Sequence, residues 1–124
     1  LYISIHLHHS NTPSVFVYYF DLPNFHQKPA FKENSTWKSQ PILHQAGSKK
    51  AANLFYSIFT ANKKDTRFLS KGAPIMLLEG TTMPALLIEP LSITTLPQHK
   101  DDMENVLNEF ALLISKSIDL YFRE

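Results

Sequence analysis

Two stretches of the chain have the hydrophobic pattern of β-strands. Residues 1–5 ("LYISI") alternate between two faces, which puts Ile3 and Ile5 on one face and His6 on the other. Residues 15–20 ("VFVYYF") are β-branched or aromatic throughout, and this predicts a second strand. The "SNTPS" segment between the two has the Asn, Pro and Ser that are typical of a turn.

Two other stretches have the spacing of amphipathic helices. Ser48 is the expected N-cap of a helix over residues 48–62, in which apolar residues recur every three or four positions. Further along, Asp101 is followed three residues later by Glu104, which resembles a capping box. This pattern predicts the start of a long helix whose apolar face extends to Tyr121.

The segments between these elements are less regular. Residues 21–47 contain three prolines among polar residues, which predicts a long insertion loop. A polar connection covers residues 63–72, and short apolar runs lie at 73–78 and 85–88. Strands that are apolar on both faces and alternate with amphipathic helices are typical of α/β proteins. We therefore expect residues 1–124 to form one α/β domain, a mostly parallel twisted sheet covered by helices.

The predicted loop also carries three isolated aromatic residues, Phe25, Phe31 and Trp37. They could stack on a sugar or a peptide, or they could anchor the loop to the body of the domain. The sequence favours neither alternative.

Composition and charge narrow the range of functions. Of the 124 residues, 44% are hydrophobic and 12% aromatic, which is ordinary for a globular domain with a real core. A net charge of +1 gives no electrostatic reason to expect binding to nucleic acid. The apolar stretches are too short for a membrane span. Because the chain has no cysteine, any metal must be held by His, Asp or Glu.

Two polar residues come directly after predicted strands. His6 follows "LYISI", and Glu89 follows "ALLI". If these strands are parallel, both side chains emerge at one edge of the sheet, where they could be a metal ligand and a general base. Alternatively, each residue merely marks the end of its strand. His8 would share a face with His6, but two histidines without a third ligand are a weak metal site. We therefore expect His8 and His9 to be surface residues at the mouth of a loop.

Two motifs resemble a known enzyme family. The "ISIHLH" stretch is similar to the "hSIHAN" strand of zinc-dependent N-acetylmuramoyl-L-alanine amidases of the type-3 kind, and "EGTTMPALLIEP" is similar to their "xxTxMPAVLVExGF" segment. The order of elements also agrees, with "VFVYYF" resembling their "GVxVYY" strand. The resemblance covers most of the chain, with residues 21–47 as an apparent insertion. It implies a hydrolase of the amide between N-acetylmuramic acid and L-alanine in bacterial peptidoglycan, located in the periplasm or at the cell wall.

The resemblance also implies the roles of individual residues. His6 aligns with the second His of a His–Glu–His zinc site, and Glu89 aligns with the general acid/base. The family's other two ligands lie upstream of the "SIH" strand, so we expect the first part of the domain to precede Leu1. The family's Ala-Asn after the ligand His is replaced here by Leu7 and His8, and its "GFxSN" after the glutamate is replaced by "PLSITT".

These differences leave two alternatives open. One is a non-catalytic relative that binds cell-wall peptides or a regulatory protein partner. The other is a different zinc hydrolase of amide bonds, such as a carboxypeptidase.

Overall fold

The structure is a computed structural model that describes residues 1–22 and 37–124. In this part of the chain, four strands form one sheet in the order β1-β4-β2-β3. The strands are β1 (Tyr2–His8), β2 (Ser14–Phe20), β3 (Arg67–Ala73) and β4 (Ala85–Ser92). The helices are α1 (Gln40–Leu43), α2 (Gln45–Asn62) and α3 (Lys100–Arg123), and the short 3-10 turns are η1 (Trp37–Ser39) and η2 (Met76–Leu78).

The α/β class is confirmed, but the sheet is mixed rather than mostly parallel. β1 is parallel to β4, and β2 is parallel to β3, whereas β2 and β4 are antiparallel. The reason lies in the short connection at residues 9–13, which makes β1 and β2 run in opposite directions. β4 inserts between these two strands, so it can be parallel to only one of them.

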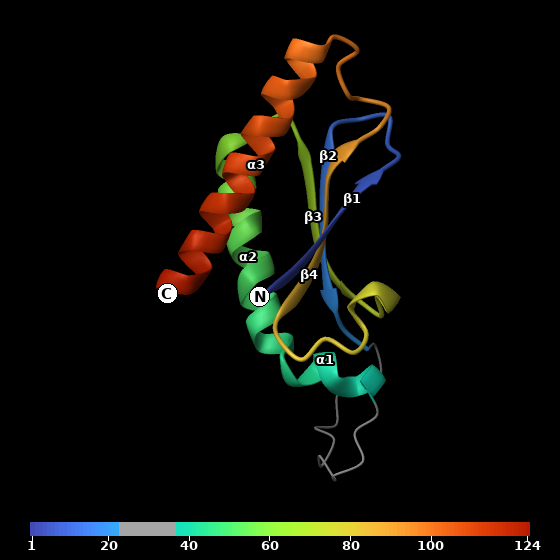
Figure 1. Cartoon of the computed structure of the whole chain (residues 1–124), viewed down its shortest axis with the longest axis vertical. Coiled ribbons are helices and arrows are strands. Elements are labelled where there is room, and N and C mark those ends of the chain that lie inside the picture. The colour runs from blue at the N-terminus through green and yellow to red at the C-terminus, as the bar shows by residue number, and fades with distance from the viewer. Residues whose placement is uncertain (23–36) are drawn as a thin grey trace.

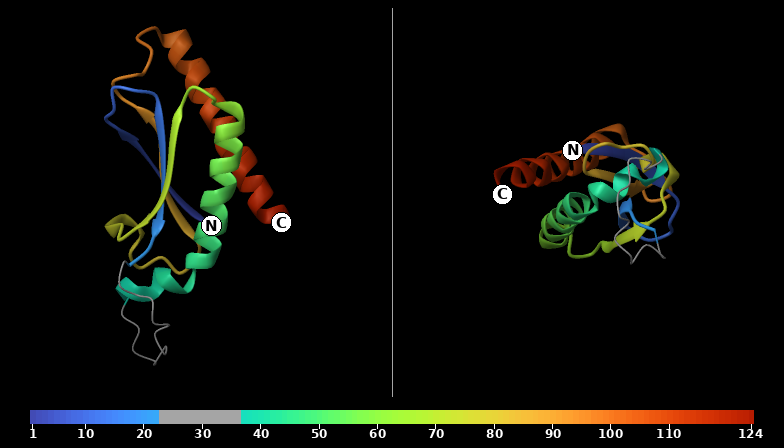
Figure 2. Two further views of the ribbon diagram at one scale, coloured as in Figure 1. Left: turned by 180° about the vertical axis from the view of Figure 1, so that it is seen from behind. Right: turned by 90° about the horizontal axis from the view of Figure 1, so that it is seen from below.

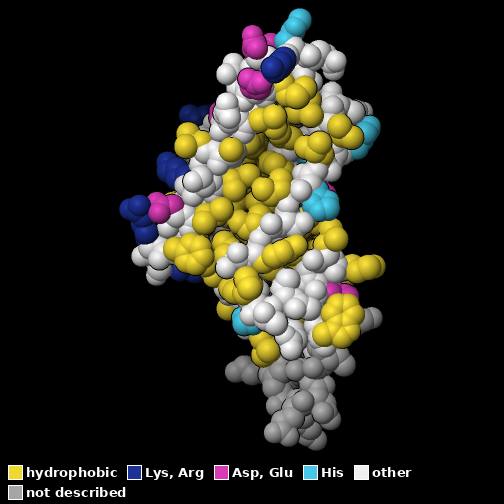
Figure 3. All heavy atoms as spheres, in the orientation of Figure 1, with side chains coloured by type: hydrophobic (Ala, Val, Ile, Leu, Met, Phe, Trp, Pro, Cys, Tyr) yellow, Lys and Arg dark blue, Asp and Glu magenta, His cyan; other side chains and the backbone are white. Residues whose placement is uncertain are grey.

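The two long helices, α2 and α3, pack on the same side of the sheet (Figures 1 and 2). α2 is the crossover between β2 and β3, and α3 follows β4 and lies beside α2. Apolar side chains gather in a hollow between α3 and β1 on the face seen in Figure 3. The fold is therefore a sheet with one complete helical layer.

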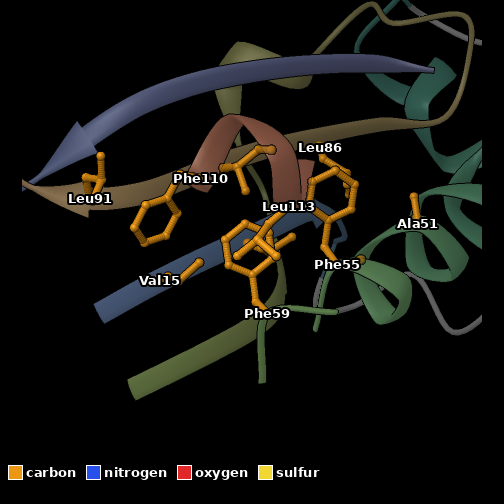
Figure 4. Packing of buried hydrophobic residues seen from close by; sticks show 11 residues of the cluster. Val15, Ala51, Phe55, Phe59, Leu86, Leu91, Phe110 and Leu113 are labelled. Carbon is orange, nitrogen blue, oxygen red and sulfur yellow. The ribbon is translucent and has the colours of Figure 1, made fainter. Parts of the chain in front are cut away.

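The main core lies between this helical layer and the sheet (Figure 4). At its centre is Phe59 of α2, which is fully buried, with ring centroids 5.7 Å from Phe110 of α3 and 6.0 Å from Phe68 of β3. Burying a side chain of this size stabilises the fold by about 1.5–3 kcal/mol. The buried members of the cluster are Val15, Val17, Ala51, Ala52, Phe55, Phe59, Leu86, Ile88, Leu91, Phe110 and Leu113.

A smaller core covers one end of the opposite face of the sheet. It contains Phe20, Leu78, Ala85 and Leu87, which come from β2, η2 and β4. The other end of this face, where β1 carries His6, lies outside the cluster. We refer to it as the open face of the sheet.

Both predicted helix caps are wrong. α2 begins at Gln45 rather than at Ser48, and Ser48 lies buried inside the helix. Its hydroxyl donates a hydrogen bond to the carbonyl oxygen of His44 (3.1 Å) and accepts one from the N–H of Ala85 (2.9 Å). α3 has no side-chain cap. Asp101 lies within its first turn, where its negative charge stabilises the helix by interacting with the positive end of the helix dipole.

Two predicted connections contain regular structure. Residues 63–72, expected to be polar and irregular, include most of β3. The predicted loop at 21–47 contains η1, α1 and the start of α2, while residues 23–36 lie outside the described part of the chain. Pro41 falls within the predicted loop, but it lies in the first turn of α1. Proline is tolerated there because the backbone N–H groups of the first turn have no hydrogen-bond acceptor within the helix.

Candidate functional site

β1 and β4 are neighbouring parallel strands, which is the condition that brings His6 and Glu89 together. The residues on either side of His6 pair with Ile88 and Leu91 of β4. Two β4 residues, Glu89 and Pro90, therefore lie opposite the single residue His6. This irregularity is a β-bulge, which locally re-aims the side chains of a strand.

The two residues lie within their strands and do not mark strand ends. β1 continues to His8 and β4 to Ser92, so the predicted boundaries at Ile5 and Ile88 were wrong. Each strand continues past its polar residue because the side chains of His6 and Glu89 project from the open face and are not part of the main core. Neighbouring strands place opposed Cα atoms about 5 Å apart, so the two side chains start from adjacent positions.

The His6 ring is accessible and has one polar neighbour on its own strand. Its side chain is exposed, and its Nε2 lies 3.0 Å from the Oγ of Ser4. Ser4 precedes His6 by two residues and therefore projects from the same face. This contact holds one ring nitrogen and leaves the other available to a ligand.

Glu89 lies between His6 and an aromatic pair on β2. It is half-buried, and its partner across the β2–β4 ladder is Phe16. The next residue of β2 on this face is Tyr18, whose ring stacks on Phe16 with centroids 6.3 Å apart. Burial raises the pKa of the Tyr18 hydroxyl, and the negative charge of Glu89 raises it further. The carboxylate of Glu89 is therefore close enough to interact electrostatically with the Tyr18 hydroxyl on the open face.

Phe16 and Tyr18 were not identified as site residues from the sequence. The signal was present, because alternation in "VFVYYF" puts these two side chains on one face and Val15 and Val17 on the other. What the sequence did not reveal was that β4 would pair with β2 and bring Glu89 beside that face.

His8 is buried, contrary to the expected surface position, whereas His9 is exposed as predicted. The side chain of His8 is only 9% exposed, and its ring packs edge-on against Phe16 with centroids 4.6 Å apart. Neither ring nitrogen of His8 has a hydrogen-bond partner. Because β1 runs three residues further than predicted, His8 belongs to the strand and is buried against Phe16 instead of lying in the turn.

Of the three aromatic residues predicted in the loop, Trp37 alone is described, and Phe25 and Phe31 lie outside the described residues. Trp37 is 59% exposed and its ring lies against Gly80, where a Cβ would approach it to 3.1 Å. Gly80 has a φ of 75°, a conformation that glycine adopts at little cost. The Trp37 ring therefore contacts the turn after η2. This turn precedes the start of β4, whereas Glu89 lies in the second half of that strand.

Residues 1–22 and 37–124 contain no group of three His, Cys, Asp or Glu side chains that could hold a metal ion. A zinc site of the expected kind needs three protein ligands. The described residues offer His6 as one ligand and Glu89 as a base beside it. Zinc binding therefore stays a prediction that requires two further ligands.

Comparison of the chain with protein-family models, with curated proteins and with solved structures found no match. The resemblance to the amidases thus rests on the two sequence motifs. Within the described part of the chain, none of the helices has the length and apolar character needed to cross a membrane.

Proposed function

We propose that the chain is part of a zinc-dependent hydrolase that cleaves the amide between N-acetylmuramic acid and L-alanine in peptidoglycan. The observation that carries the proposal is the juxtaposition of His6 and Glu89. They come from motifs more than 80 residues apart, yet parallel pairing and a bulge set them opposite each other on the open face. In this proposal His6 is a zinc ligand and Glu89 is the general acid/base.

The surroundings of both residues suit these roles. His6 is exposed toward the side where a substrate would lie, and its contact with Ser4 restricts the orientation of its ring. In this proposal Glu89 takes a proton from the attacking water and returns it to the leaving nitrogen. Its half-buried place opposite Phe16 supports this role, because the carboxylate is partly shielded from solvent and still accessible. When bound, zinc would lower the pKa of a coordinated water toward neutrality.

The proposed substrate also implies a location and partners. Peptidoglycan hydrolysis would take place in the periplasm or at the bacterial cell wall, and a regulatory protein could control access to the site. A second candidate function is a non-catalytic relative that binds cell-wall peptides or a partner protein. The observation that favours it is that the described residues supply one zinc ligand instead of three.

Two substitutions test the proposal on the full-length protein. We expect about one zinc per chain by elemental analysis. His6→Ala should lose most of this zinc, whereas the control His9→Ala, also an exposed histidine, should keep it. Glu89→Gln should keep zinc but hydrolyse muramoyl-peptides about 100-fold or more slowly. The matching control is Glu79→Gln, which alters another half-buried carboxylate at a different site and should remain active.

The outcomes separate the candidate functions. A fully active Glu89→Gln variant would remove Glu89 from the mechanism, and zinc retained by His6→Ala would remove the ligand assignment. Absence of zinc after reconstitution would favour the non-catalytic candidate. Cleavage of free peptides in preference to muramoyl-peptides would instead indicate a zinc peptidase.

A further inference from the structure

The side chain of Ser92 joins the end of β4 to the turn that follows β1 (Figure 1). Ser92 is the last residue of β4 and is 1% exposed. Its Oγ accepts a hydrogen bond from the backbone N–H of Ser10 and donates one to the carbonyl oxygen of the same residue, both at 2.8 Å. A single hydroxyl therefore satisfies both backbone polar groups of Ser10, as the backbone of a neighbouring strand would.

The loop after β4 adds two contacts to this connection. The hydroxyl of Thr94 also donates to the carbonyl oxygen of Ser10, and its oxygen lies 2.8 Å from the Oγ of Ser92. The backbone N–H of Ile93 donates to the carbonyl oxygen of His8 at 3.0 Å. We call Ser10, Ser92 and Thr94 the hydroxyl cluster. It lies directly beyond the bulge of the candidate site.

The hydroxyl cluster matters because the β1–β4 ladder is short beyond the bulge. The two strands form two residue pairs there, and the first joins Leu7 to Leu91. Without the bulge, Leu7 would pair with Pro90 instead, which is a slip of one residue. Such a slip moves Ser92 by about 3.3 Å along the strand, which is enough to break its two bonds of 2.8 Å to Ser10. These bonds therefore belong to the bulged register.

Burial of Leu91 in the main core also favours the bulged register. The hydrophobic effect is not directional, however, so apolar packing alone tolerates small shifts of the strand ends. Hydrogen bonds depend steeply on distance and angle, and they restrict such shifts. The core therefore selects the register, and the hydroxyl cluster determines how closely the ends of β1 and β4 are held.

We propose that Ser92 is a positioning residue for the candidate site. By holding the strand ends together directly beyond the bulge, it keeps Glu89 in one orientation relative to His6. A bulge re-aims the side chains beside it, so looser strand ends would let the Glu89 carboxylate take up several positions. A displacement of about 1 Å at a reacting group can cost about 100-fold in rate. The catalytic consequence rests on the proposed function, whereas the hold on the strand ends does not.

Kinetics of the full-length, zinc-loaded protein test the catalytic consequence. Ser92→Ala should keep its zinc, because the hydrogen bonds of Ser92 go to Ser10 and Thr94 and not to a proposed zinc ligand. Its KM for muramoyl-peptides should change little, while kcat falls by about 10- to 100-fold because the base is misplaced. Ser92→Thr retains the hydroxyl and should restore most of kcat, since Ser92 lines a cavity of about 160 Å³ that has room for the added methyl group.

Ser48→Ala is the matched control. Ser48 is a buried residue of α2 beside the other end of β4, and its Oγ likewise accepts a backbone N–H, that of Ala85 at 2.9 Å. This substitution should lower stability without lowering kcat, so it separates positioning of the site from general loosening of the sheet. If Ser92→Ala fails to fold, Thr94→Val replaces it, because Thr94 is exposed and its hydroxyl donates to the same carbonyl oxygen of Ser10. Thr94→Val should also lower kcat, by a smaller factor.

Nuclear magnetic resonance of the same protein tests the hold on the strand ends without any assay of activity. Leu7 and Leu91 pair across the ladder, so nuclear Overhauser contacts should join their backbone protons. These contacts should persist in Ser48→Ala and become weaker in Ser92→Ala, because the strand ends then separate part of the time.

Three results would overturn the proposal. They are an unaltered kcat in Ser92→Ala, an equal fall of kcat in Ser48→Ala, and unaltered contacts between Leu7 and Leu91 in Ser92→Ala. If the unaltered protein hydrolyses no muramoyl-peptide, the proposed function fails. The contacts between Leu7 and Leu91 then still decide whether Ser92 holds the strand ends.

Discussion

Replacement of Ser48 by alanine tests how α2 is joined to the sheet. The side chain of Ser48 is 3% exposed, and its Oγ accepts the N–H of Ala85, the first residue of β4, at 2.9 Å. The same Oγ donates to the carbonyl oxygen of His44. That carbonyl keeps a second bond, from the backbone N–H of Ser48 at 2.9 Å. The loss in Ser48→Ala therefore falls on the Ala85 N–H, which is left buried without its partner.

The magnitude follows from the cost of that unpaired group. A buried donor without an acceptor costs about 1–3 kcal/mol. Alanine returns about 0.5 kcal/mol through its higher helix propensity. The free energy of unfolding should therefore fall by about 0.5–2.5 kcal/mol, a substantial part of the roughly 5–15 kcal/mol of a typical domain. The corresponding decrease in Tm is on the order of 4 °C per kcal/mol for a chain of this size.

Urea unfolding followed by circular dichroism measures this difference, with Ser57→Ala as the matched control. Ser57 lies on the same helix and is exposed, and its Oγ donates a local bond of 3.0 Å to the carbonyl oxygen of Leu54. Ser57→Ala should change the unfolding free energy by no more than about 0.5 kcal/mol in either direction. Equal effects of the two substitutions would refute the argument that the Ser48–Ala85 bond joins α2 to β4.

Two further predictions concern the core and the open face. Phe59→Ala should lower the free energy of unfolding by about 3–5 kcal/mol in the same urea assay, because it leaves a cavity at a fully buried site. The control Tyr56→Ala, at an exposed position of the same helix, should lower it much less. Since burial and the charge of Glu89 raise the pKa of Tyr18, its hydroxyl should ionise above the ordinary value of about 10. Ultraviolet titration of the chain, compared with that of Tyr18→Phe, measures the pKa of Tyr18. Glu89→Gln should lower this pKa only in part, because burial still raises it. An unchanged titration in Glu89→Gln would contradict the electrostatic interaction between the two residues. Because the unfolded chain ionises first, the stability that the neutral Tyr18 contributes is present below about pH 10 and is lost as pH rises through the raised pKa.

The parts of the fold that local sequence predicts are those in which pattern and burial agree. β2 begins one residue from its expected start, and α3 was recognised from its long apolar face. β3 was missed because Arg67, Ser70 and Lys71 interrupt its apolar residues and none of its seven residues is fully buried. It forms a strand because α2 returns the chain beside β2, and pairing of this kind is decided by tertiary structure rather than by propensity.

The candidate site shows the same division. The sequence predicts that His6 and Glu89 come together only if their two strands are parallel, and β1 and β4 meet this condition as direct neighbours. The burial of His8 depends on a contact with Phe16, which belongs to a strand that is not adjacent to β1 in the sheet. A pattern within one strand contains no information about such a contact.

Pro90 belongs to the bulge of β4 that sets the geometry of the site. The apolar run at 85–88 predicts a strand that ends before Glu89, and Pro90, which donates no hydrogen bond, would be expected to interrupt a regular strand at the same place. A proline is tolerated in an interior strand where a bulge interrupts the ladder, and Glu89 and Pro90 form that bulge opposite His6. In a regular strand Leu91 would share a face with Glu89, but the extra residue returns Leu91 to the helix side, where it joins the main core. The bulge thus lets β4 present Glu89 on the open face and still bury the residues that follow, so the position of the candidate base is determined inside the strand rather than by its end.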